Sequence, residues 1–72
     1  MKDRIRLLDV VALTDDLDQK GLIRGQVGTV VEELAPGVFE IEFSDDSGRM
    51  YAHAAIEAER LIVLHYETAG TA

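Results

Sequence analysis

The 72-residue sequence contains no cysteine, no tryptophan and a single proline, Pro36. Without cysteine the chain forms neither a disulfide nor a thiolate metal site, so its stability depends on the packing of its core. A chain of this length is close to the lower limit for folding without such cross-links. The lack of disulfides is typical of the cytoplasm, and we expect a cytoplasmic protein.

Long hydrophobic runs are also missing. No apolar stretch approaches the roughly 20 residues that a membrane-spanning helix needs. Asp9 interrupts the apolar residues that follow the charged N-terminus, so residues 1–13 do not have the pattern of a secretory signal peptide. We therefore expect an intracellular protein that has no membrane partner.

Basic side chains are few, with seven Lys and Arg against fourteen Asp and Glu, and the formal net charge is −7 at pH 7. Affinity for nucleic acids comes largely from basic side chains that neutralise phosphates. The charge balance therefore argues against a nucleic-acid partner and favours solubility and a basic protein partner.

The residues that are present favour β-strands. At 38–43 the apolar side chains of Phe39, Ile41 and Phe43 alternate with other residues, which is typical of a strand with one buried face. Four more apolar or β-branched segments complete a set of five predicted strands, at 7–13, 27–34, 38–43, 49–56 and 61–64.

The segments between the strands predict the turns. A polar loop at 14–21 follows the first strand, the reversal at 35–37 contains Pro and Gly, and residues 57–60 suit one 3-10 turn. We predict an all-β fold, a small five-stranded barrel that forms one domain over residues 1–64. The C-terminal residues 65–72 are predicted to be a disordered tail.

Three glycines mark the stretch 21–31, where Gly25-Gln26-Val27-Gly28-Thr29-Val30 leads from the loop into the second strand. We predict that Gly25 or Gly28 has a positive φ or a close backbone contact that excludes a Cβ atom. Together with 9–13, 39–43 and Leu61, this stretch resembles an uncharacterised bacterial family, domain of unknown function 4926. The resemblance covers about residues 8–64 and implies an SH3-like barrel with no catalytic residues to carry over.

The alternation also predicts the core and the pairing of the third and fourth strands. We expect nine buried side chains: Val10, Leu22, Val27, Val30, Phe39, Ile41, Phe43, Ala52 and Leu61. A six-residue hairpin loop would set residue 39 opposite 54, 41 opposite 52 and 43 opposite 50. In that register Glu40 lies opposite His53, and Glu42 lies opposite Tyr51.

No group of residues predicts catalysis, a cofactor or a metal. A nucleophilic active site needs an activated Ser, Thr or Cys beside a base, and the only histidines are His53 and His65. Two tyrosines and two phenylalanines are too few for a groove that binds proline-rich peptides. The candidate interaction surface consists of loop charges and exposed strand side chains: Asp15, Asp16, Asp18, Arg24, Tyr51 and His53.

We therefore predict a small non-enzymatic protein-interaction module or accessory protein that binds another protein. It is expected to be a monomer or a weak homodimer paired through an edge strand. Two alternatives remain open. One is a nucleic-acid or ribosome-associated module of the KOW type, which has a similar Gly-x-Val-Gly-x-Val pattern. The other is a partner protein of the antitoxin or immunity type.

Overall fold

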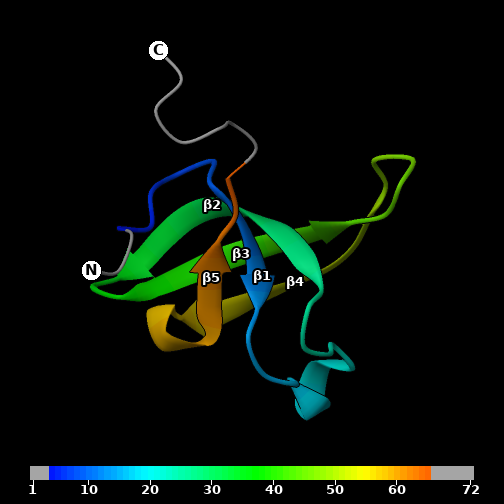
Figure 1. Cartoon of the computed structure of the whole chain (residues 1–72), viewed down its shortest axis with the longest axis horizontal. Helices are drawn as coiled ribbons and strands as arrows, with labels where there is room; N and C mark the ends of the chain where they lie inside the picture. The colour runs from blue at the N-terminus through cyan, green and yellow to red at the C-terminus, as the bar shows by residue number, and fades with distance from the viewer. Residues whose placement is uncertain (1–3, 66–72) are drawn as a thin grey trace.

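A computed structural model describes residues 4–65 of the chain, and this part is all-β (Figure 1). Five antiparallel strands form one sheet in the order β4-β3-β2-β1-β5, and the described residues contain no α-helix. In chain order the elements are β1 (Val10–Leu13), the 3-10 turn η1 (Asp18–Lys20), β2 (Val27–Ala35), β3 (Val38–Ser44), β4 (Met50–Glu57), the 3-10 turn η2 (Ala58–Arg60) and β5 (Leu61–Val63).

The predicted all-β class, the loop after the first strand and the 3-10 turn before the last strand are confirmed. The barrel is not closed by hydrogen bonds, because β4 and β5 are the two edges of the sheet. The long strand β2 carries the sheet around its bend, and β1 and β5 cross over β3 and β4 in Figure 1. The tail predicted at 65–72 lies outside the described residues except for His65.

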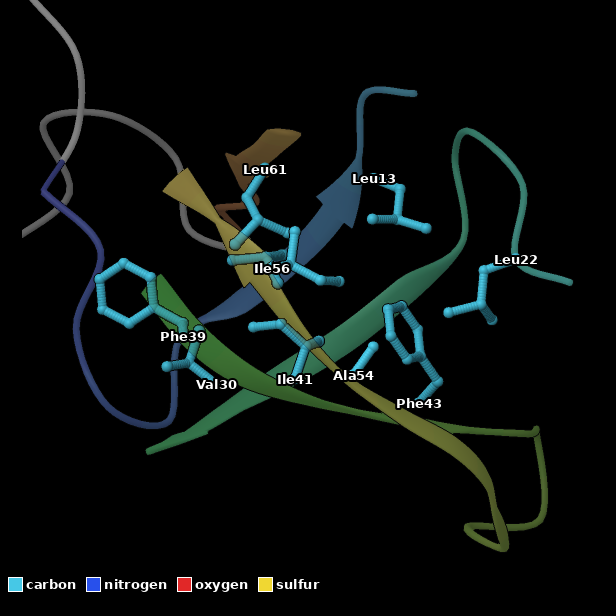
Figure 2. Packing of buried hydrophobic residues seen from close by; sticks show 10 residues of the cluster. Leu13, Leu22, Val30, Phe39, Ile41, Phe43, Ala54, Ile56 and Leu61 are labelled. Atoms are coloured by element: carbon cyan, nitrogen blue, oxygen red, sulfur yellow. The ribbon is translucent and has the colours of Figure 1, made fainter. Parts of the chain in front are cut away.

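The core lies between the two halves of the bent sheet (Figure 2). Its buried side chains come from all five strands and from the loop after β1: Val11, Leu13, Leu22, Val30, Phe39, Ile41, Phe43, Ala54, Ile56 and Leu61. Six of the nine predicted core residues are in this cluster. No polar or charged side chain of the described residues is buried, so burial of apolar surface is what holds the sheet in its bent form.

Three predicted core residues lie elsewhere. Val27 is 44% exposed, while Val10 and Ala52 are half-buried. Successive side chains of a strand point to opposite faces, so Val27 and Val30 cannot both point inward from a regular strand. Gly28, next to Val27, faces the core instead, and Val27 is therefore on the outer face.

The first strand is shorter than predicted, because residues 6–9 form a turn. Asp9 N donates to Arg6 O at 3.1 Å, and Arg6 N donates to Asp9 Oδ2 at 2.9 Å. Leu8 lies within this turn and has a φ of 71°. The left-handed backbone at Leu8 ends the extended conformation, so β1 begins at Val10 and not at residue 7.

The predicted register between β3 and β4 was wrong by two residues. In the structure Ile41 lies opposite Ala54 and Phe43 lies opposite Ala52. Two features together produce the shift. The hairpin loop has five residues and not the predicted six, because Ser44 pairs with Met50. A β-bulge between the Phe43 and Ser44 pairs shifts the register by one further residue.

The loop between β3 and β4 is fixed by one carboxylate. Asp45 Oδ1 accepts hydrogen bonds from Ser47 N at 3.0 Å, Ser47 Oγ at 2.8 Å and Arg49 N at 3.0 Å. Asp45 N also donates to Arg49 O at 2.9 Å. These bonds hold the turn at residues 45–49 and thereby set the register of the hairpin.

A shift of two residues leaves the side chains of residues 52–56 on their predicted faces, because side chains alternate with a period of two. Met50 lies beyond the bulge and is 48% exposed. His53 now lies opposite Glu42 instead of Glu40. His53 Nδ1 nevertheless contacts Glu40 Oε2 at 2.7 Å, as a diagonal pair on the outer face. The predicted contact between Glu40 and His53 is present, although the register that predicted it was wrong.

Candidate interaction surface

The loop after β1 brings three of the six predicted surface residues together. Thr14, Asp15, Asp16, Ile23 and Arg24 line a shallow hollow of about 580 Å³. Asp16 Oδ1 accepts a hydrogen bond from Arg24 N at 2.8 Å, and Thr14 Oγ1 donates to Asp15 Oδ2 at 3.5 Å. The loop therefore returns on itself, and Asp15, Asp16 and Arg24 line the same hollow.

Tyr51 is tied to the same loop through Gln26. The side chain of Gln26 accepts a hydrogen bond from Ile23 N at 2.6 Å and donates one to the hydroxyl of Tyr51 at 3.0 Å. The Tyr51 ring packs against Phe43, with centroids 6.4 Å apart, and the residue stays 49% exposed. Gln26 thus joins the end of the loop to the start of β4, a link that the sequence did not indicate.

The remaining two predicted residues lie apart from this hollow. Asp18 is exposed in η1, where its carbonyl oxygen accepts a hydrogen bond from Gly21 N at 3.2 Å. His53 is on the outer face of β4 beside Glu40. The six candidates therefore do not form one continuous site.

Two glycines allow the loop to enter β2 close to β3. Gly25 has a φ of +93°, and its N–H donates to Leu13 O at 2.8 Å. A Cβ atom on Gly28 would lie 2.7 Å from Ile41 Cγ2 and 2.9 Å from the carbonyl oxygen of Glu42. The prediction for this pair is confirmed at both positions, because one needs a left-handed backbone and the other needs the space of a missing side chain.

A second hollow, which the sequence did not predict, is an apolar groove of about 550 Å³ along β5. We call it the β5 groove, and it is lined by Ile5, Thr14, Ala58, Glu59, Leu61, Ile62 and Val63. Ile62 is 54% exposed there, whereas Ile5 and Val63 pack partly against the core. Ile5 and Thr14 are distant in the chain from η2 and β5, so no local sequence pattern indicates the groove.

None of the described strands pairs with β5 on the side away from β1. Leu64 N donates to Val10 O and Thr14 N donates to Arg60 O, each at 2.9 Å. Hydrogen-bonded residues alternate along an antiparallel pair, so residues 60, 62 and 64 face β1 while Leu61 and Val63 face outward. The carbonyl of Leu61 and both polar groups of Val63 therefore point to the free edge of the sheet.

The described residues contain no group of three or more His, Cys, Asp or Glu side chains that could hold a metal ion. At Asp45 the hydrogen bond from the Ser47 hydroxyl, followed by the bond from Arg49 N, holds the pKa of the carboxyl below its ordinary value. That carboxylate stabilises a turn. Within residues 4–65 no helix has the length and apolar character needed to cross a membrane.

Over residues 4–65 the fold and surface define a small all-β domain that has an apolar groove and two sheet edges, β4 and β5, each paired with a described strand on one side only. The family model described as Domain of unknown function (DUF4926) matches residues 7–63, and the chain belongs to this family. No curated protein and no solved structure matches the chain.

Proposed function

We propose that this protein is a non-enzymatic, cytoplasmic protein-interaction module of the SH3-like class. Its partner supplies an extended segment that places an aliphatic side chain in the β5 groove. The groove carries the proposal, because it combines the exposed side chain of Ile62 with apolar walls beside an open strand edge. A segment that pairs with such an edge gains main-chain hydrogen bonds, and pockets beside the strand select its side chains.

The net charge of −7 favours a basic partner, although the charges close to the β5 groove are mixed, since Arg4 and Arg6 lie on either side of Ile5 and line an adjoining hollow with Val63. Glu59 lines the groove itself, and Thr14 lines both the groove and the neighbouring hollow that contains Asp15 and Asp16. These carboxylates are part of the excess of acidic over basic side chains in the sequence. Lys or Arg residues that flank the aliphatic anchor would increase the association rate and set its orientation.

The test is a selection from a random peptide display library on immobilised protein, followed by fluorescence polarisation of the enriched peptides. We expect enrichment of peptides with alternating aliphatic residues flanked by Lys or Arg. The variant Ile62→Asp should lose their binding by tenfold or more, because it puts a charge into the apolar groove. Val31→Asp is the matched control, since Val31 is also exposed, at 41%, but does not line the β5 groove.

Two outcomes would overturn the proposal. One is that no peptide sequence is enriched above background on the wild-type protein. The other is that the enriched peptides bind wild type and Ile62→Asp with equal affinity, which would place binding elsewhere.

A further inference from the structure

The charged side chains near β5 differ between the two ends of the strand. Glu59 lines the β5 groove just before the strand begins. Beside the other end of β5 lie the N-terminal residues (Figure 1), and a second hollow of about 300 Å³ is found there. We call it the arginine hollow, and it is lined by Arg4, Arg6, Asp9, Val63, Leu64 and His65. Val63 lines both the β5 groove and the arginine hollow, so the two adjoin.

The arginine hollow offers positive charge to an acidic group. Arg4 and Arg6 are both exposed. Within residues 4–65 the cations found in ion pairs are His53 and Arg60, so neither Arg4 nor Arg6 forms an ion pair with a described residue. Asp9 also lines the hollow, but its Oδ2 accepts a hydrogen bond from Arg6 N at 2.9 Å, and two guanidinium groups outnumber this one carboxylate.

The start of β5 has the opposite charge. Arg60 follows Glu59, but its Nε lies 3.9 Å from Glu57 Oε1, so the turn before β5 has two carboxylates and one guanidinium. The neighbouring hollow that shares Thr14 likewise has two carboxylates and one guanidinium. A segment that lies along β5 therefore has acidic side chains near one of its ends and basic side chains near the other.

The direction of such a segment follows from the sheet. Every pair of neighbouring described strands is antiparallel. Antiparallel pairing is also slightly more stable per residue than parallel pairing. The N-terminal residues of a segment antiparallel to β5 lie beside the arginine hollow, and its C-terminal residues lie beside Glu59.

We propose that the partner segment pairs antiparallel with β5 and has the pattern acidic-x-aliphatic-x-aliphatic-x-basic. Its aliphatic side chains lie opposite Val63 and Leu61, its acidic side chain contacts Arg4 and Arg6, and its basic side chain contacts Glu59. These four side chains share one face, because residues two apart in a strand point the same way. The pattern rests on the proposed function and adds to it the direction of the segment and an acidic residue near its N-terminal end.

Two peptides of equal composition test the direction: Asp-Thr-Ile-Thr-Ile-Thr-Lys and its reverse, Lys-Thr-Ile-Thr-Ile-Thr-Asp. Both are labelled and have uncharged termini, and binding is measured by fluorescence polarisation over a concentration series at low salt. The first peptide should bind about fivefold more tightly, because two exposed ion pairs form in one direction and like charges meet in the other. The difference should shrink as salt is added.

Charge variants test the arginine hollow. Arg6→Glu and Arg4→Glu should each weaken binding of the first peptide by about threefold or more, and each should favour a peptide in which Lys replaces the acidic residue. Arg49→Glu is the matched control, since it makes the same charge change at an exposed position that lines neither the β5 groove nor the arginine hollow. Thermal melting checks that each variant is folded.

The outcomes separate this proposal from the proposed function. Equal affinities for the two peptides, both lost in Ile62→Asp, would overturn the direction and leave binding at the β5 groove intact. Tighter binding of the reversed peptide would overturn antiparallel pairing. Arg4→Glu and Arg6→Glu proteins that bind as Arg49→Glu does would overturn the contact with the arginine hollow. If neither peptide binds wild type at millimolar concentration, this proposal fails, and the display selection then decides whether the proposed function fails with it.

Discussion

Replacing Gly28 by alanine gives the sharpest test of how the bent sheet is packed. Gly28 faces the core opposite Phe43 where β2 pairs with β3. An added Cβ atom would lie 2.7 Å from Ile41 Cγ2, 2.9 Å from the carbonyl oxygen of Glu42 and 3.0 Å from Phe43 Cδ2. Ile41 and Phe43 are fully buried, and one of the three contacts is backbone, so the strand itself must move to make room.

Two opposing effects determine how much Gly28→Ala changes the free energy of unfolding. Overpacking a filled core costs about 1–3 kcal/mol. Alanine also makes the unfolded chain less flexible than glycine does, which stabilises the folded protein by about 0.4–1 kcal/mol. We therefore expect Gly28→Ala to lower the free energy of unfolding by about 1–2 kcal/mol. In a domain of this size that corresponds to a fall in Tm of about 5–15 °C.

The assay is thermal and urea unfolding of wild type and Gly28→Ala followed by circular dichroism. Val31→Ala is a control in the same strand, because Val31 is exposed and its truncation should change stability by less than about 0.5 kcal/mol. A Gly28→Ala protein that melts at or above the wild-type temperature would refute the close approach of β2 and β3.

Three further predictions concern the core, the hairpin loop and nucleic acid. Ile41→Ala, at a fully buried position, should cost about 2–5 kcal/mol and leave little cooperative unfolding in urea, since a domain this small has a total stability of only about 5 kcal/mol; an unchanged urea midpoint would remove Ile41 from the core. The pKa of Asp45 is lowered in the folded state, so its carboxylate stabilises the fold above the unfolded pKa, and this contribution is lost as pH falls through the folded pKa. Asp45→Asn should therefore be less stable than wild type at neutral pH, with a gap that closes in acid urea titrations; a gap that is independent of pH would contradict this. Generic single- or double-stranded nucleic acid should give no gel shift at physiological salt, and a salt-dependent shift at micromolar protein would support the KOW-type alternative.

Local patterns in the sequence predicted which residues share a face but not which residues meet across strands. The alternation of Phe39, Ile41 and Phe43 assigned the inner face correctly because side-chain direction depends only on a period of two. The register depended on the turn that Asp45 closes and on one bulge. No hydrophobic pattern encodes the hydrogen bonds of this turn or the position of the bulge.

For the candidate interaction surface too, the sequence indicated only contacts between residues that are close in the chain. Asp15, Asp16 and Arg24 are close in the chain, and the loop that contains them brings them together in space. The β5 groove requires Ile5 to meet Ile62, which lies almost at the other end of the described chain. Contacts between such distant residues depend on the strand order of the whole sheet, so they become visible only in the folded structure.

Binding of a partner segment at the β5 groove is tested most directly by NMR titration of uniformly ¹⁵N-labelled protein with the peptide from the display selection that binds most tightly. Binding at the β5 groove predicts that the largest amide shift changes fall on residues 58–63 and on Thr14, and that Ile62→Asp abolishes them. Shift changes confined to another part of the surface, or equal changes in wild type and Ile62→Asp, would show that the peptide does not bind at the β5 groove.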